Sequence, residues 1–194
     1  LDDDCALCLT PQAFNNVDTY LAPFIRHDGL SYKKVRQAVQ KFVFNLNTTS
    51  RWGGQSPFTN VTFDLTPPKH IAGEAVIIGG KLTDSTYGEY AAEMEMFNRA
   101  FLEVMLDGDY AGQIFSFPIP TYNVTEDFPW ESEIGELLLK LTAKYGAPYF
   151  QNFINSELSP EDVRSMCCRL KMDLRELRNK VGGLFGAGDL TGSI

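Results

Sequence analysis

The chemistry that this sequence could support centres on two adjacent cysteines, Cys167 and Cys168, in the run Met166-Cys167-Cys168-Arg169-Leu170. Paired cysteines can pack as small hydrophobic side chains, bind a metal, form a redox pair or act as a nucleophile with its neighbour. Packing is the default interpretation of these residues alone. A cysteine between a helix and a glycine-rich run can instead lie at the tip of an exposed loop, where its weak S–H bond suits it to hydrogen-atom transfer.

A metal site is a weaker interpretation of the same pair. Two thiolates would need two further ligands, and the supporting candidates, His27, His70, Cys5 and Cys8, are all distant in sequence. Cys5 and Cys8 have redox or metal spacing but lack a thioredoxin-like strand and helix around them. We therefore expect no metal site here. Cys5 and Cys8 fit a disordered end or a partial zinc site better than catalysis, and His27 fits a surface turn beside Asp28.

A second candidate site is the run Arg51-Trp52-Gly53-Gly54-Gln55-Ser56-Pro57-Phe58-Thr59-Asn60. Paired glycines let a backbone approach a ligand closely or adopt positive φ. Backbone amides there, and the side chains of Gln55, Ser56, Thr59 and Asn60, could then donate to an anion or a sugar. A simple turn explains the pattern better when it is taken alone, and the run lacks the spacing and the Lys-Ser/Thr pair of a phosphate loop.

The elements that must position these residues alternate between helices and strands. Apolar side chains at spacings of three and four predict helices over Ser31 to Leu46, Tyr87 to Leu106 and Glu131 to Lys144. A fourth helix is predicted to start at Ser159-Pro160-Glu161-Asp162, where a serine cap precedes a proline and two acids. Extended segments are predicted over Pro57 to Leu65, Gln113 to Tyr122 and Tyr149 to Ile154, with room for hairpins at Asp64 to Pro68 and Val76 to Lys81. This order indicates an α/β fold with a mainly parallel sheet or barrel.

Composition excludes several classes of protein. The 194 residues are 44% hydrophobic and 22% charged, which is typical of a globular protein. A formal charge of -8 gives no basic field for a nucleic-acid polymer. No apolar run approaches the roughly 20 residues that a bilayer crossing needs, and no signal peptide opens the chain. We therefore expect reduced thiols in a cytoplasmic protein.

The motif from Arg51 to Asn60, with Asn45-Leu46-Asn47 before it, resembles the anaerobic, class III ribonucleoside-triphosphate reductases. The resemblance continues through four further runs: Asn16-Val17-Asp18-Thr19-Tyr20-Leu21-Ala22-Pro23-Phe24, Phe115-Ser116-Phe117-Pro118-Ile119-Pro120-Thr121-Tyr122-Asn123, the Cys167 and Cys168 run, and Gly186-Ala187-Gly188-Asp189-Leu190-Thr191-Gly192-Ser193-Ile194. It divides the chain into a non-matching segment, residues 1–11, and a partial glycyl-radical reductase barrel domain, residues 12–194.

The resemblance implies part of a ten-stranded α/β barrel with a finger loop, incomplete in this chain. Cys168 matches the family's active cysteine, which would form a thiyl radical and take the 3′ hydrogen of a ribonucleotide, after which the 2′ hydroxyl leaves as water. Cys167 would help handle the reducing electrons or simply pack. Gly54, Gln55, Ser56 and Thr59 would lie beside the substrate. The reaction would supply deoxyribonucleotides for DNA synthesis.

The cofactors and partners implied by the resemblance lie outside this chain. They are a glycyl radical on a region absent here, ATP and deoxynucleotide effectors acting allosterically, and a separate radical-SAM activase carrying S-adenosylmethionine and an iron–sulfur cluster. A homodimer is expected for the full-length protein, and the isolated fragment is expected to be inactive. Ser193 stands where formate-dependent members have asparagine, so the reductant is formate or a thioredoxin-like protein.

Two alternatives stay open from the sequence. One is a glycyl-radical acyltransferase of the pyruvate formate-lyase type, which also uses adjacent cysteines on a finger loop. The other is a nucleotide-binding fragment without catalysis.

Overall fold

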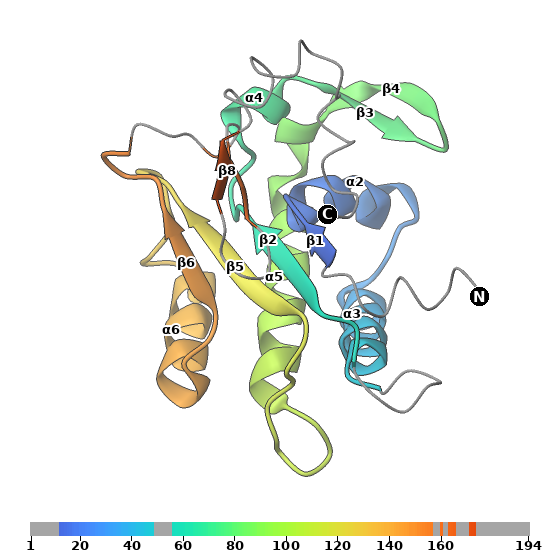
Figure 1. Ribbon diagram of the computed structural model, residues 1–194. Helices are drawn as coiled ribbons and strands as arrows, with labels where there is room; N and C mark the ends of the chain where they lie inside the picture. Colours follow the sequence, from blue (N-terminus) through green and yellow to red (C-terminus); the bar gives the residue numbers. More distant parts are fainter. Residues whose placement is uncertain (1–11, 49–55, 157–159, 161–162, 166–170, 174–194) are drawn as a thin grey trace, which may run out of the picture.

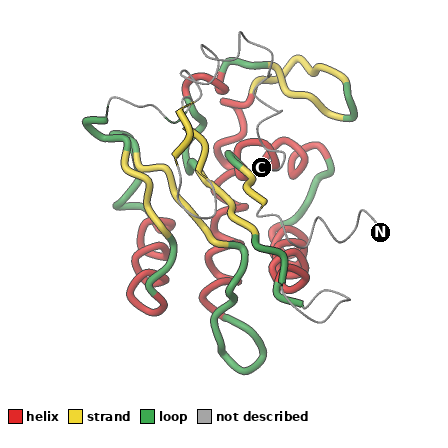
Figure 2. The backbone as a smooth tube through the Cα atoms, viewed as in Figure 1, coloured by secondary structure: helices red, strands yellow, loops and turns green. Residues whose placement is uncertain are grey.

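The protein forms a parallel sheet with helices packed on one face (Figures 1 and 2). The structure is a computed structural model, and it describes residues 12–48, 56–156, 160, 163–165 and 171–173. The sheet has the strand order β1-β2-β5-β6 and all three of its pairings are parallel. Its strands are β1 (Gln12–Phe14), β2 (Thr59–Phe63), β5 (Ile119–Val124) and β6 (Tyr149–Asn152).

Four longer helices connect and cover these strands. They are α2 (Val17–His27), α3 (Tyr32–Leu46), α5 (Ala91–Asp107) and α6 (Glu133–Tyr145). Local sequence sets several of their ends. The Ser132 hydroxyl accepts from the Gly135 N–H at the start of α6, and Gly146 ends that helix at φ 69°. A short 3₁₀ helix, η1 (Tyr87–Tyr90), leads into α5, with a capping box between Thr86 and Glu89.

The hydrophobic core lies between the sheet and helices α3, α5 and α6. Side chains alternate along a strand, so Val61 and Phe63 of β2 share one face, and both belong to the core. Phe63 stacks on Tyr122 of β5 at 4.9 Å and contacts Phe101 of α5 at 4.7 Å between ring centroids. This face of the sheet is therefore the one that stabilises the fold by burying apolar surface.

Two antiparallel hairpins and a short helix complete the described part of the chain. The hairpin of β3 (Ala75–Ile78) and β4 (Lys81–Thr86) follows α4 (Lys69–Ala72), and a small core joins these elements to α2 and η1. The second hairpin pairs β7 (Val163–Ser165) with β8 (Lys171–Asp173).

The structure confirms the main elements predicted from the sequence and corrects others. Helices α3, α5 and α6 and strands β2, β5 and β6 all lie within or near the predicted ranges. The fourth predicted helix is wrong over Val163–Ser165, which is strand β7. A serine cap and early acids favour a helix only weakly, and tertiary pairing with β8 overrides them. Helix α2 has no counterpart among the predicted elements.

The predicted fold class is confirmed at the level of a mixed α/β fold with a parallel sheet. The described residues supply four strands of that sheet, so the ten-stranded barrel stays a prediction. None of the helices in this part of the chain combines the length and apolar composition that a membrane crossing requires.

Candidate active site

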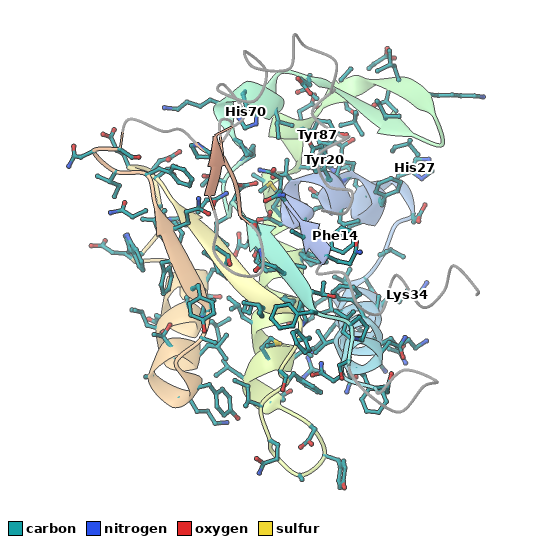
Figure 3. The ribbon with its side chains drawn as sticks, in the orientation of Figure 1. Phe14, Tyr20, His27, Lys34, His70 and Tyr87 are labelled. Atoms are coloured by element: carbon teal, nitrogen blue, oxygen red, sulfur yellow. The ribbon has the colours of Figure 1, made fainter. Side chains whose placement is uncertain are left out.

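Polar side chains gather where the parallel strands end. Asp64 follows β2 directly, and Asn123 lies one residue before the end of β5. Both line a cavity of about 330 Å³, together with Thr66, Pro67, Pro68, Lys69, His70, Thr125, Glu126, Asp127, Phe153, Ser156 and Pro160. Figure 3 shows His70 at this end of the sheet, above the strands. The carboxyl ends of strands are where open α/β sheets bind ligands.

Asp64 is the centre of a buried hydrogen-bond network at the wall of this cavity. One carboxylate oxygen, Oδ1, accepts from Asn123 Nδ2 at 2.8 Å. The other, Oδ2, accepts from Asn16 Nδ2 at 2.7 Å and from the Thr19 hydroxyl at 3.1 Å. Asn16 and Thr19 flank the start of α2, so this carboxyl group joins that helix to both central strands.

A second buried carboxyl group, Asp18, lies beside the first. Its oxygens accept backbone N–H groups of Asp64 at 3.1 and 3.2 Å, Leu65 at 2.9 Å and Thr19 at 3.0 Å. Leu65 adopts φ 63°, a conformation that costs free energy for a non-glycine residue. Two consecutive N–H groups then face one carboxylate, an arrangement that favours a negative charge on Asp18.

The network continues into the core of the protein. Asn98 of α5 is fully buried and donates to Asp18 Oδ2 at 2.8 Å. Its amide oxygen accepts the hydroxyl of Tyr122 at 3.2 Å. Burial, followed by the nearby charge of Asp18, raises the pKa of Tyr122 well above its usual value, so this hydroxyl stays protonated and acts as a donor.

Burial raises the pKa of both carboxyl groups. For Asp64 it acts together with the neighbouring charge of Asp18 and lifts the pKa from 3.8 to about 7, against the opposing effect of three hydrogen-bond donors. For Asp18 burial also raises the pKa, and four hydrogen bonds, the first from Asn98, oppose it. A carboxyl group at a cavity wall with a pKa near 7 has the property that a general acid or base requires.

Helix α2 is held in place by contacts with η1 and with the start of α5. The Arg26 guanidinium donates to both carboxylate oxygens of Glu93, at 2.8 and 2.7 Å, and to the backbone oxygen of Glu89. It also lies over the ring of Tyr90, 4.3 Å from the centroid. Tyr20 packs edge-on against Tyr87 at 5.5 Å (Figure 3). These contacts fix the helix that carries Asp18.

The structure places only part of the predicted site. Ser56 precedes β2, and Thr59 is its first residue, with a buried hydroxyl that donates to the Pro57 backbone oxygen at 3.2 Å. Both lie at the opposite end of β2 from the cavity. Gly54 and Gln55 lie outside the described residues, so the substrate-binding assignment of all four stays a prediction.

All four cysteines, Cys5, Cys8, Cys167 and Cys168, also lie outside the described residues, and their assignments stay predictions. Strands β7 and β8 flank Cys167 and Cys168 in the sequence, with Ser165 paired to Lys171. His27 is exposed, as predicted, and its Nδ1 lies 2.8 Å from an oxygen of Asp28. The described residues contain no group of three His, Cys, Asp or Glu side chains that could hold a metal ion.

Sequence reasoning missed the Asp18–Asp64 network. Asp18 and Asn123 stand within runs that carry the family resemblance, but no role was predicted for either. The available signal was position, because Asp64 directly follows the last residue of β2 and Asn123 lies one residue before the end of β5. No spacing rule could bring Asp18 to them, because 46 residues separate Asp18 from Asp64.

Comparison with known proteins decides the family. The family model for anaerobic ribonucleoside-triphosphate reductase matches residues 9–194. The chain belongs to this reductase family. The match does not favour the acyltransferase or the non-catalytic alternative. No curated protein sequence gives a significant match.

A solved structure of a member has a similar fold. It is the crystal structure of the anaerobic ribonucleotide reductase from Thermotoga maritima with citrate in the active site. The similarity has a TM-score of 0.52 at 16% sequence identity and covers 77% of the 194 residues of the present chain. The chain spans 28% of the length of the Thermotoga maritima chain. At this identity the likeness supports the fold and assigns no residue a role.

Proposed function

We propose that this chain forms part of the catalytic barrel of an anaerobic ribonucleoside-triphosphate reductase, which makes deoxyribonucleotides for DNA synthesis. The observation that carries the proposal is the sheet itself. One face packs on helices, and the other carries polar side chains that are nevertheless buried, including Asn60 and Thr62 of β2 and Asp64 directly after it. A closed barrel with helices outside would turn that polar face inward, where a nucleotide can bind away from bulk water.

Cys168 is the residue proposed to attack the substrate. As a thiyl radical it would take the hydrogen atom from C3′ of the ribose, which forms an S–H bond and leaves a carbon radical. The 2′ hydroxyl would then take up a proton and depart as water, and the reductant would supply the two electrons that complete the reduction. The antiparallel pairing of Ser165 with Lys171 supports this proposal. These residues flank Cys168 in the sequence, and the family expects its cysteine at a loop tip. A glycyl radical of the complete enzyme would supply the unpaired electron.

The remaining residues would position the ribonucleotide and exclude water. Gly54, Gln55, Ser56 and Thr59 are proposed to contact the substrate from the start of β2, and Cys167 to help carry the reducing electrons. ATP and deoxynucleotide effectors, a radical-SAM activase, a homodimer and a formate or thioredoxin-like reductant belong to the same proposal.

The test is turnover by the complete enzyme after anaerobic activation. Wild type should convert ribonucleoside triphosphates to deoxyribonucleotides, and Cys168→Ser should abolish conversion while nucleotide binding stays near the wild-type level. Cys5→Ser is the matched control, because the family resemblance gives Cys5 no role, and it should keep full turnover. Turnover by Cys168→Ser would remove the catalytic assignment.

A further inference from the structure

Two side chains on β2 are buried without complete hydrogen bonding. Asn60 and Thr62 are each only 2% exposed. Within the described structure, neither Asn60 Nδ2 nor the Thr62 hydroxyl has a hydrogen-bond partner. Most buried polar groups in proteins are paired, because leaving one unpaired costs about 1–3 kcal/mol. Two such groups on one strand therefore need an explanation.

Both side chains lie on the face of the sheet opposite the helices. They alternate with Val61 and Phe63, which pack into the core. Thr62 is level with Thr121 of the neighbouring strand β5. The Thr121 hydroxyl donates to Asn60 Oδ1 at 3.2 Å, which fixes the amide of Asn60 and leaves its N–H groups to point elsewhere.

This pair lies on the same face of the sheet as the cavity wall, although the cavity is lined by Asp64 and not by Asn60 or Thr62. Asp64 stands two residues after Thr62 on the same face and lines that cavity. Two residues of a strand span about 7 Å. Thr62 is therefore about 7 Å and Asn60 about 14 Å along the strand from Asp64, and a ligand that extends from the cavity along β2 by that length would reach both unpaired groups.

The chemistry of this face favours a neutral, hydroxyl-bearing ligand. Its side chains on β2 and β5 are amides, hydroxyls, the apolar Ile119 and the carboxyl group of Asp64, with no lysine or arginine among them. Beside Asn60 and Thr62 a phosphate would lack a positive partner, whereas Lys69 lines the cavity itself and could pair with a phosphate there. A sugar hydroxyl both donates and accepts. It can accept from Asn60 Nδ2 and exchange a hydrogen bond with Thr62.

We infer that Asn60 and Thr62 hydrogen-bond the ribose hydroxyls of the ribonucleotide substrate. This inference rests on the proposed reductase function and goes beyond it by naming two positioning residues on β2. Without ligand, the two unpaired polar groups lower the stability of the folded protein. The bound substrate completes the missing hydrogen bonds.

The test compares three variants of the complete, activated enzyme. Thr62→Val keeps the shape of the side chain and removes the hydroxyl, Thr62→Ser keeps the hydroxyl, and Thr142→Val removes a hydroxyl on α6 that bonds within its own helix. Thr62→Val should lower kcat/KM for a ribonucleoside triphosphate by roughly three- to tenfold, the loss of one neutral hydrogen bond. Thr62→Ser and Thr142→Val should stay near wild type.

Thermal unfolding without ligand separates substrate positioning from a structural role. Thr62→Val should unfold at or above the wild-type temperature, because it removes an unpaired buried hydroxyl. A large loss of stability, failure to fold, or an unchanged kcat/KM would overturn the inference and leave the proposed function standing. Absence of ribonucleotide turnover by wild type would instead overturn the function, and this assignment with it.

Inhibition by inorganic triphosphate distinguishes the sugar from the phosphate as the contacted group. Its strength should be the same for wild type and Thr62→Val. If Thr62→Val weakens inhibition by inorganic triphosphate as much as it lowers kcat/KM, the hydroxyl contacts the phosphates, and the inference is wrong.

Discussion

Replacing Asp64 by asparagine should change how the stability of the fold depends on pH. Burial and the charge of Asp18 raise the pKa of this carboxyl group from 3.8 to about 7. The folded protein thus holds the proton more tightly than the unfolded chain does, and unfolding releases it between these two values. Stability contributed by the protonated form is complete below about pH 4 and is lost as the pH rises through 7.

The size of the effect follows from the pKa difference. At about 1.4 kcal/mol for each pKa unit, the difference between 3.8 and about 7 amounts to a loss of about 4 kcal/mol. Asp64→Asn cannot ionise and keeps the shape of the side chain. It can keep its bonds to Asn16 and Thr19, and a turn of the Asn123 amide restores the third. The variant should therefore gain stability relative to wild type as the pH rises from 5 to 8.

Urea unfolding at pH 5, 6, 7 and 8 measures the part of this change that falls above pH 5, about 3 kcal/mol. The free energy of unfolding of wild type should fall across the series, whereas that of Asp64→Asn should stay nearly level. Asp84→Asn on β4 is the matched control, because its side chain is exposed, and it should follow wild type. Parallel pH profiles for wild type and Asp64→Asn would refute the reasoning.

Three further substitutions test the network and the packing around it by urea unfolding at constant pH. Asp18→Asn should cost about 3 kcal/mol, because it places an amide among backbone N–H donors; a neutral result would contradict the charge assigned to Asp18. Tyr122→Phe should cost about 1–2 kcal/mol, because the oxygen of Asn98 loses its donor; stability equal to wild type would refute that. Gly135→Ala should cost about 1–3 kcal/mol, because its Cβ would lie 2.2 Å from the Trp130 backbone oxygen. Gly73→Ala, which meets nothing within 4 Å, should be tolerated, and equal losses at both glycines would contradict the steric argument.

Periodicity predicted the covering helices because one face of each is buried. The stripe of Val35, Val39 and Val43 in α3 is apolar and buried, as the spacing requires. Helix α2 was missed for the opposite reason. Its buried residues include Asp18, Thr19 and Pro23, so its inward face is not an apolar stripe. Its polarity serves the hydrogen-bond network, and a pattern based on hydrophobicity cannot detect such a face.

The candidate site could be predicted only where it follows the chain locally. The composition of the run from Arg51 to Asn60 predicts a candidate ligand site at the start of β2. The cavity lies at the other end of that strand and combines residues from three separate connections. Their proximity depends on the parallel register, in which Thr62 pairs with Thr121 and Asn123 with Gln151. Register is a tertiary property, and neither the spacing nor the charge of the residues specifies it.

Neighbouring residues of strand β2 have different roles, because alternate side chains face the core and the proposed substrate site. Its apolar members, Val61 and Phe63, face helices and hold the strand in place. Two of its polar members, Asn60 and Thr62, face away, and the Asn60 Nδ2 group and the Thr62 hydroxyl have no hydrogen-bond partner in the described structure. Asp18 accepts backbone N–H groups at the end of the strand, so the position of the polar face along its axis is fixed before any ligand binds. A site built on such a strand is preorganised, because the free energy of holding it comes from the opposite face.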